Sequence, residues 1–421
     1  MRRCTPPLLG LLALSLLGSC YRMQTMRRQV AKLDGYPRVE GEVRVPTWEG
    51  EPIVVVLLRP PAESAAPTPI VDRVQLYEPG RFRFITRPGD YRVAAFLDGD
   101  GDLALDAGEA WVGPVPVEGG SPALLELDPA RNARRPDPEL ILARDYRLGD
   151  RISLDDPRVG RASGPYGIYQ PLRWTERYVM GVFFLERYDP ERTPVLFVHG
   201  ISGFPAQFER WAELLDGTRY QPWFVHYPSG LPLELVSEWL ARSLSELHTT
   251  HGFERLCVVA HSMGGLVARE VLNRHVESSA PPYHRGLVTI AAPFGGLGSA
   301  ELGVSWSPSV APAWRDLVPG SPFLEALHRR PLPPEVDYEL LFLFDGASGA
   351  DGVVPIPSQL RAEAQAEAER IRGLGGTHGG ILEERAAWDV VSRALERCEA
   401  SELSVPEAAT EPALPGASAP R

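Results

Sequence analysis

An apolar run that breaks into small residues around a single serine constrains this chain most. Residues 256–259 predict a buried strand, and residues 266–272 predict a helix a few positions later. A serine at the tip of such a strand-to-helix turn has strained backbone angles and tolerates only small residues two positions to either side. Ala260 and Gly264 occupy those positions. The pattern therefore predicts a nucleophile elbow with Ser262 at its tip.

A serine hydroxyl is a weak nucleophile, so the elbow requires a histidine base and a carboxylate that orients it, in the chain order Ser, Asp, His. Residues 338–344 predict a late buried strand, and the loop after it carries Asp345 and Asp351. We favour Asp351, which leaves enough chain to curl toward the histidine, and Asp345 remains the alternative. The candidate base is His378, in a glycine-rich loop before an amphipathic helix near residues 382–395.

Five other histidines lie in polar stretches where solvated side chains are expected: His248, His251, His275, His284 and His328. His199 and His261 flank motif residues and are expected to shape turns through hydrogen bonds. His226 has no role that the sequence suggests.

A second strand-to-loop transition fits the same chemistry. Residues 194–198 predict a buried strand that opens into a His-Gly-Ile-Ser-Gly loop. A developing oxyanion needs two fixed backbone donors, one from the residue after the nucleophile and one from an early loop of this kind. The predicted donors are the amides of Met263 and Ile201.

These motifs together resemble the α/β-hydrolase superfamily, in the region of bacterial lipases and GPI-inositol-deacylase-like esterases. The resemblance covers residues 177–398, with Ala260 where the usual pattern has glycine. Residues 286–296 are similar to the strand and turn that follow the elbow in many lipases, and Asp351 before Gly-Val-Val-Pro resembles the lipase acid loop. The resemblance implies a mostly parallel sheet flanked by helices. It also implies a serine esterase or lipase that needs no cofactor for catalysis, with a triad of Ser262, Asp351 and His378.

Residues 297–334 are rich in Pro, Trp, Ser and Gly and follow no regular period. Their place in the chain predicts a lid over the site. Two interpretations remain open for its large side chains, which either line an acyl pocket or pack the segment onto the body: Trp306, Trp314, Leu317, Phe323 and Leu324.

The N-terminus has the features of an exported lipoprotein. Arg2 and Arg3 precede an apolar run too short to span a bilayer, and Leu17-Gly18-Ser19-Cys20 resembles a lipobox. Residues 1–20 are then a signal peptide, and Cys20 carries the lipid. Tyr21 in place of Asp indicates the outer membrane in a Gram-negative envelope. Basic residues of the tether, residues 21–37, either contact anionic headgroups or are solvated: Arg22, Arg27, Arg28 and Lys32.

Removing Cys4 with the signal and Cys20 with the lipid leaves Cys257 and Cys398. We expect no disulfide between them, with Cys257 a buried apolar filler in its strand.

Residues 38–130 predict a small all-β sandwich that precedes the hydrolase body, similar to prealbumin-like or carboxypeptidase-regulatory modules. Pro, Gly and Asp turns separate six short strands, at residues 42–45, 53–58, 74–77, 81–85, 91–96 and 123–127.

One loop of this segment has calcium-ligand spacing. Carboxylates stand at positions 1, 3, 5, 9 and 12 of a twelve-residue stretch: Asp98, Asp100, Asp102, Asp106 and Glu109. Leu103 replaces the glycine of the EF-hand at position 6, and the loop follows a strand. The loop is either a structural calcium site or an acidic hairpin that binds nothing.

The remaining segments predict a connector at residues 131–176, a solvated helix at residues 360–371 and a disordered tail at residues 399–421. A net charge of −12 with no basic stripe argues against nucleic acid. The sequence thus predicts a lipid-anchored envelope serine hydrolase that cleaves lipid or acyl esters. The alternative is a surface lipoprotein that binds lipid, glycan or protein through the β-sandwich, with a degenerate hydrolase scaffold.

Overall fold

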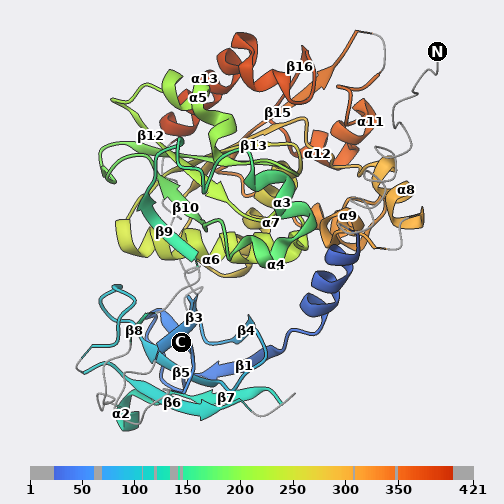
Figure 1. Ribbon diagram of the computed structural model, residues 1–421. Coiled ribbons are helices and arrows are strands. Elements are labelled where there is room, and N and C mark those ends of the chain that lie inside the picture. Colours follow the sequence, from blue (N-terminus) through green and yellow to red (C-terminus); the bar gives the residue numbers. More distant parts are fainter. Residues whose placement is uncertain are drawn as a thin grey trace, which may run out of the picture.

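The computed structural model describes residues 23–60, 69–106, 108–117, 121–132, 141–142, 146–306, 309–346 and 349–401. It consists of an α/β body and a smaller all-β lobe, with a helix of the N-terminal segment running between them (Figure 1). The predicted signal peptide, Cys20 and most of the predicted tail lie outside the described residues. In the part of the chain that is described, no helix is both long and apolar enough to cross a bilayer.

An eight-stranded sheet forms the centre of the α/β body, and every neighbouring pair in it is parallel except β10 and β12. A parallel sheet covered on both faces needs strands that are apolar along their whole length. Strands β12, β13 and β14 are buried at every residue. The order is β16(Arg370–Gly375), β15(Asp337–Phe344), β14(His284–Ile290), β13(Leu256–His261), β11(Thr193–Val198), β12(Tyr220–His226), β10(Met180–Phe184) and β9(Tyr146–Arg151).

Two hydrophobic clusters pack the helices onto the two faces of this sheet. The larger cluster joins α6(Leu233–His251), α7(Met263–Glu277), α9(Pro312–Asp316) and α10(Pro322–Leu327) to it. The second joins η1(Pro205–Phe208), α5(Glu209–Leu214), η2(Gly380–Glu383) and α13(Arg385–Ala400). The remaining helices are α3(Ser163–Tyr169), α4(Pro171–Trp174), α8(Gly298–Trp306), α11(Ile356–Gln359) and α12(Ala362–Glu367). The α/β fold predicted from the sequence is therefore confirmed.

Both ends of the sheet differ from the sequence prediction. Strand β9 pairs with β10, so the sheet begins before residue 177, inside the predicted connector. At the other end, the helix predicted at residues 360–371 is wrong in its last four residues, because α12 ends at Glu367 and β16 starts at Arg370 and pairs with β15. This edge strand is largely exposed and carries no apolar run, so nothing in its pattern indicated a strand.

The N-terminal lobe is the predicted β-sandwich. One sheet has the order β4(Arg81–Ile85), β1(Arg38–Arg44) and β7(Ala123–Glu126). The other has the order β6(Trp111–Pro116), β5(Arg92–Leu97), β2(Ile53–Leu58), β3(Pro69–Leu76) and β8(Ile141–Leu142), and α2(Pro129–Asn132) lies near its edge. Side chains of both sheets share one core, among them Val43 and Phe84 from the first and Val55 and Val93 from the second. Strand β6 was missed because its glycine and prolines resemble a turn, although an edge strand tolerates proline.

Ion pairs fix the sandwich against α6. Arg73 of β3 pairs with Glu246, and both side chains are buried. Arg83 of β4 pairs with Glu238, whose carboxylate also contacts Arg242 on the next turn of the helix. Burial of a charge is tolerated only when a partner compensates it. The sandwich and the α/β body are therefore joined by complementary charges.

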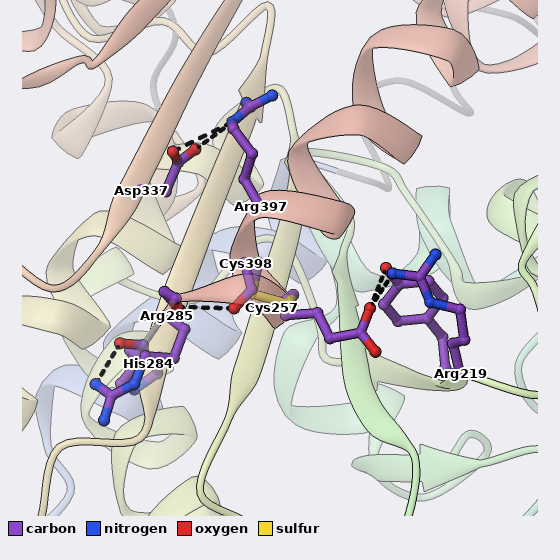
Figure 2. Close-up of a disulfide and its surroundings, with 10 residues drawn as sticks. Arg219, Cys257, His284, Arg285, Asp337, Arg397 and Cys398 are labelled. Carbon is purple, nitrogen blue, oxygen red and sulfur yellow. Dashed lines mark hydrogen bonds and ion pairs between the residues drawn. A yellow bond between two sulfur atoms is a disulfide. The ribbon is translucent and has the colours of Figure 1, made fainter. Parts of the chain in front are cut away.

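A disulfide corrects the expectation for the two remaining cysteines. Cys257 of β13 and Cys398 of α13 are bonded across 141 residues, with their Cα atoms 6.1 Å apart (Figure 2). A Cβ at Gly286 on the neighbouring strand would meet the Cβ of Cys398 at 2.6 Å, so this glycine makes room for the bond. The two cysteines are distant in the sequence, and only the assembled sheet and helix bring them together.

Candidate active site

Ser262 lies at the tip of the turn between β13 and α7. Its backbone has φ 58° and ψ −132°, the strained geometry expected for an elbow. A Cβ at Gly264 would lie 2.4 Å from the carbonyl oxygen of Val198, which explains the small residue there. The amide of Ser262 donates to the carbonyl of Ile290, 2.8 Å away, and holds the tip against β14.

The structure brings the three predicted triad residues into one hydrogen-bonded line. The Nε2 atom of His378 is 2.9 Å from the Oγ of Ser262, and its Nδ1 atom is 2.6 Å from the Oδ2 of Asp351. The amide of His378 also donates to the carbonyl of Asp351. The partner of His378 is thus Asp351, the favoured candidate, and not Asp345.

Asp351 is buried but well compensated. Its second oxygen, Oδ1, accepts from the amides of Val353 and Val354, at 2.9 and 2.7 Å. Burial raises the pKa of this carboxyl, but the bond to His378 and the two amides outweigh burial and lower the pKa below its ordinary value. Asp351 is therefore ionised at neutral pH and can hold the imidazole in the tautomer whose Nε2 faces Ser262.

His261 supports the loop that carries His378. Its Nε2 atom is 2.8 Å from the carbonyl oxygen of His378 and must donate to it, because a carbonyl only accepts. Burial lowers the pKa of His261 to about 3, so the ring is neutral. The sequence prediction that this histidine shapes a turn through a hydrogen bond is confirmed.

The loop after β11 lies directly against Ser262. A Cβ at Gly200 would meet the Cβ of Ser262 at 2.7 Å, so only glycine allows this approach. Ile201 follows in the same loop, and Met263 is the first residue of α7, whose N–H has no partner inside its own helix. The two predicted oxyanion residues thus follow directly after Gly200, which contacts Ser262, and after Ser262 itself.

A buried network holds this loop in place. The Nδ1–H of His199 donates to the carbonyl of Gly200 at 2.9 Å, and its Nε2 accepts from the amide of Tyr227. The Tyr227 hydroxyl donates to the carbonyl of His199 at 2.6 Å, and the two rings stack. Burial lowers the pKa of His199 to about 4 and keeps the ring neutral. His226, which the sequence left unexplained, bridges Val179 and Ser163 behind this network.

The described part of the predicted lid, residues 297–306 and 309–334, contains the short helices α8, α9 and α10. Leu317 and Leu324 are buried in the larger core cluster, and Phe323 packs against it. For these three side chains the packing interpretation is confirmed. Trp314 packs against the cluster around Met26 of the N-terminal helix. Trp306 is 84% exposed at the end of α8, so neither interpretation describes it.

The expectation of solvated histidines is wrong for most of the five. His275 and His284 are buried, and both contact the ring of Tyr283. His248 stacks on the same tyrosine. The side chain of His328 is buried, and its Nδ1 atom contacts the carboxylate of Glu367 at 2.9 Å. For His248, His275 and His328, the sequence did not indicate burial, because the residues they contact, Tyr283 and Glu367, lie in other segments of the chain.

Three of the five predicted calcium ligands lie together. One carboxylate oxygen from each of Asp98, Asp100 and Asp102 lies within 4.8 Å of the others. Glu109 instead accepts from the amides of Gly99 and Asp106 and closes the loop. Burial, and then the nearby charge of Glu109, raise the pKa of Asp98 to about 6. The oxygen donors suit calcium, but the loop is also closed by its own hydrogen bonds, so both interpretations stand.

The sheet order, the elbow and the loop after β11 together define a hydrolase of the α/β class. A family model described as the alpha/beta hydrolase family matches residues 195–413, more than half of the chain, and the chain belongs to this family. A comparison with curated proteins found no match.

Several solved structures are similar to the chain. The mature lipase BlEst2 of Bacillus licheniformis is 19% identical, with a TM-score of 0.41, over 50% of this chain and 94% of that one. The lin2722 product of Listeria innocua is 18% identical, with a TM-score of 0.40, over 49% and 94%. The monoacylglycerol lipase of Paleococcus ferrophilus is 17% identical, with a TM-score of 0.37, over 51% and 96%. Similarity at this level concerns the fold alone.

Proposed function

We propose that this hydrolase is a serine esterase or lipase that cleaves carboxylic esters of lipids or other acyl compounds. The observation that carries the proposal is the line of hydrogen bonds from Ser262 through His378 to Asp351. A serine, a histidine and a buried carboxylate in this order form the arrangement that activates a hydroxyl for acyl transfer. The strained elbow supports it further, because it lifts the hydroxyl away from the sheet.

In the proposed mechanism, His378 accepts the proton of Ser262 as the Oγ atom attacks the ester carbonyl. Asp351 stabilises the imidazolium that forms, and the amides of Ile201 and Met263 donate to the oxyanion. The imidazolium then protonates the leaving alkoxide, which leaves an acyl-enzyme on Ser262. Water, activated by the same histidine, releases the acid and restores the hydroxyl.

Hydrolysis of p-nitrophenyl esters from acetate to palmitate tests this proposal. The wild-type protein is compared with Ser262→Ala and with the control Ser392→Ala, a serine whose hydroxyl bonds within α13. We expect turnover that Ser262→Ala abolishes and Ser392→Ala preserves, and the preferred chain length separates an esterase from a lipase. A folded protein that turns over no ester and does not react with a fluorophosphonate at Ser262 would instead support the non-catalytic binding lipoprotein.

We also propose that Cys20 anchors the protein to the cell envelope, at the outer membrane in a Gram-negative source. The bond between Cys257 and Cys398 supports export, because structural disulfides persist in oxidising compartments and are rare in reducing ones. Metabolic labelling with an alkyne fatty acid tests the anchor. Label is expected on the wild-type protein and not on Cys20→Ser, and its absence from both would refute the proposed lipidation.

A further inference from the structure

The segment that follows the proposed anchor is a docked helix. Residues 23–34 are helical, although the sequence suggested only a tether. Met26 and Val30 are buried against Ile168 and Ala311 of the α/β body. The side-chain oxygen of Gln29 accepts from the amide of Leu172 at 2.9 Å. The helix therefore has a fixed orientation on the α/β body.

The outer side of this helix is basic. Arg27, Arg28 and Lys32 are exposed, whereas the chain as a whole has a net charge of −12. A local cluster of cations on an acidic protein is the charge arrangement that attracts anionic headgroups and holds the rest of the molecule away from them. Met23, the first residue of this helix that the structure describes, lies three positions after Cys20 in the sequence.

Helix α8 presents large apolar side chains beside this basic helix. Leu302 is 63% exposed and Trp306 is 84% exposed, and Glu301 is the only charged residue of α8. Figure 1 shows α8 next to α9, and Trp314 of α9 packs against the cluster formed by Met26. Tryptophan is the side chain most typical of the bilayer interface, where its ring lies at headgroup level. We call Arg27, Arg28, Lys32, Leu302 and Trp306 the docking surface.

We propose that the docking surface lies on an anionic lipid bilayer and brings the active site to it. This inference rests on the proposed serine hydrolase function and on the proposed anchor at Cys20. The basic helix supplies long-range attraction to anionic headgroups, and the exposed apolar side chains of α8 insert at the interface. A lipid at Cys20 would hold the same end of the molecule at the membrane, so the lipid anchor and the docking surface would act together.

The same contacts explain how docking serves catalysis. Ile201, the proposed oxyanion donor, packs against the cluster of Met26, Val30 and Ala311. The loop beside Ser262 therefore lies directly behind the docked helix. A site held in this position takes acyl esters from the bilayer itself, so the substrate class is a membrane lipid ester.

Tryptophan quenching by brominated lipids tests the docking. The full chain, purified in detergent, is reconstituted into vesicles of brominated phosphatidylglycerol and phosphatidylethanolamine, and separately into brominated phosphatidylcholine. Wild-type protein is compared with Trp306→Phe and with the matched control Trp48→Phe, which replaces an indole of the β-sandwich by a phenyl ring. We expect the anionic vesicles to quench the wild type and Trp48→Phe more strongly than Trp306→Phe. The variant Arg27→Gln/Arg28→Gln keeps Trp306 and is expected to be quenched by anionic vesicles only as weakly as Trp306→Phe.

Equal quenching of the wild type, Trp48→Phe and Trp306→Phe by anionic vesicles would overturn the proposal. If phosphatidylcholine vesicles quenched Trp306 as strongly as anionic vesicles do, the requirement for anionic lipid would be overturned. If the protein instead formed a dimer through Trp306 that does not bind vesicles, the docking surface would be assigned to a second copy of the chain.

Turnover of p-nitrophenyl acetate in the same samples reports on the proposed function separately. The double variant Trp306→Phe/Leu302→Ala is expected to hydrolyse p-nitrophenyl acetate at the wild-type rate. Its turnover of an ester embedded in vesicles should fall by about tenfold, because less apolar surface inserts into the bilayer. If the protein turns over no ester at all, the proposed function fails, while the quenching result still decides the docking.

Discussion

The Nε2 atom of His261 donates to the carbonyl oxygen of His378 across 2.8 Å. The residue that precedes Ser262 in the sequence is thus hydrogen-bonded to the backbone of His378, the proposed base. His261 is the last residue of β13, and Ser262 follows it directly. The hydrogen bond therefore fixes the loop that carries His378 to the end of this strand. The separation of Ser262 and His378 then depends on a side chain that takes no part in proton transfer.

We expect His261→Phe to lower kcat by about tenfold to a hundredfold, because small misplacements of a catalytic group are costly. His261→Gln, which keeps a donor at similar reach, should recover part of the rate. A positioning role also predicts a kcat loss with little change in KM and an unchanged shape of the pH profile. A variant whose rate falls only in proportion to its loss of folded protein would contradict this role.

Asp351→Asn should lower kcat by about three to four orders of magnitude, the effect of losing the carboxylate that fixes the histidine tautomer. Asp345→Asn is the matched control at the same strand end and should keep most of the activity. Kinetics on one soluble ester compare the two directly. If the two variants were reversed in effect, the acid would be assigned to Asp345.

Removing the disulfide should destabilise the protein. Cys257→Ser with Cys398→Ser is expected to lower the free energy of unfolding by about 2–4 kcal/mol, since the bond closes a long loop of the unfolded chain. Denaturant unfolding of the double variant and of the wild type with and without reductant measures this loss. Gly286→Ala, which places a methyl group against Cys398, should also destabilise. Wild-type stability that does not respond to reductant would refute the bond.

The buried histidines predict acid sensitivity. Burial lowers the pKa of His275 to about 4 from an ordinary 6.5, and it lowers the pKa of His284 well below 6.5. The unfolded state therefore binds more protons than the folded state between these values, so stability is complete above pH 6.5 and falls as the pH drops toward 4. Thermal unfolding between pH 7.5 and 4.5 should show this fall, and it should be shallower in His275→Gln. An equal loss of stability in the wild type and in His275→Gln would assign the acid sensitivity to titratable groups other than His275.

Calcium titration decides between the two interpretations of the acidic loop. A calcium site predicts a higher unfolding midpoint with millimolar calcium, an effect that chelator reverses and that Asp100→Asn/Asp102→Asn abolishes, because these carboxylates and Asp98 are the oxygens that lie together. Magnesium is the control cation. A midpoint that no cation moves would leave the loop as a hairpin closed by Glu109.

The grouping of Ser262, Asp351 and His378 in space was the part of the molecule that the sequence predicted best. An elbow serine needs small neighbours and a preceding buried strand, so Ala260, Gly264 and β13 identify it within a few residues. The acid was harder, because two aspartates follow β15 and only the folded loop shows which one reaches His378.

Other features depend on contacts between distant segments and leave no local pattern. Strand β16 is defined by pairing with β15, and the bond between Cys257 and Cys398 depends on where α13 packs. Among residues 23–34 of the N-terminal helix, only Met26, Gln29 and Val30 are buried, in one narrow stripe, so the sequence suggested a tether.

The ion pairs between the β-sandwich and α6 bear on how truncations should be interpreted. Deleting the sandwich removes Arg73 and Arg83 and leaves Glu238 and Glu246 on α6 without these partners. Helix α6 packs against α7, the helix that begins directly after Ser262. A shortened protein that loses activity would therefore not show that the sandwich recognises a substrate. Point substitutions on the outer strands, away from α6, are the informative way to ask what this lobe binds.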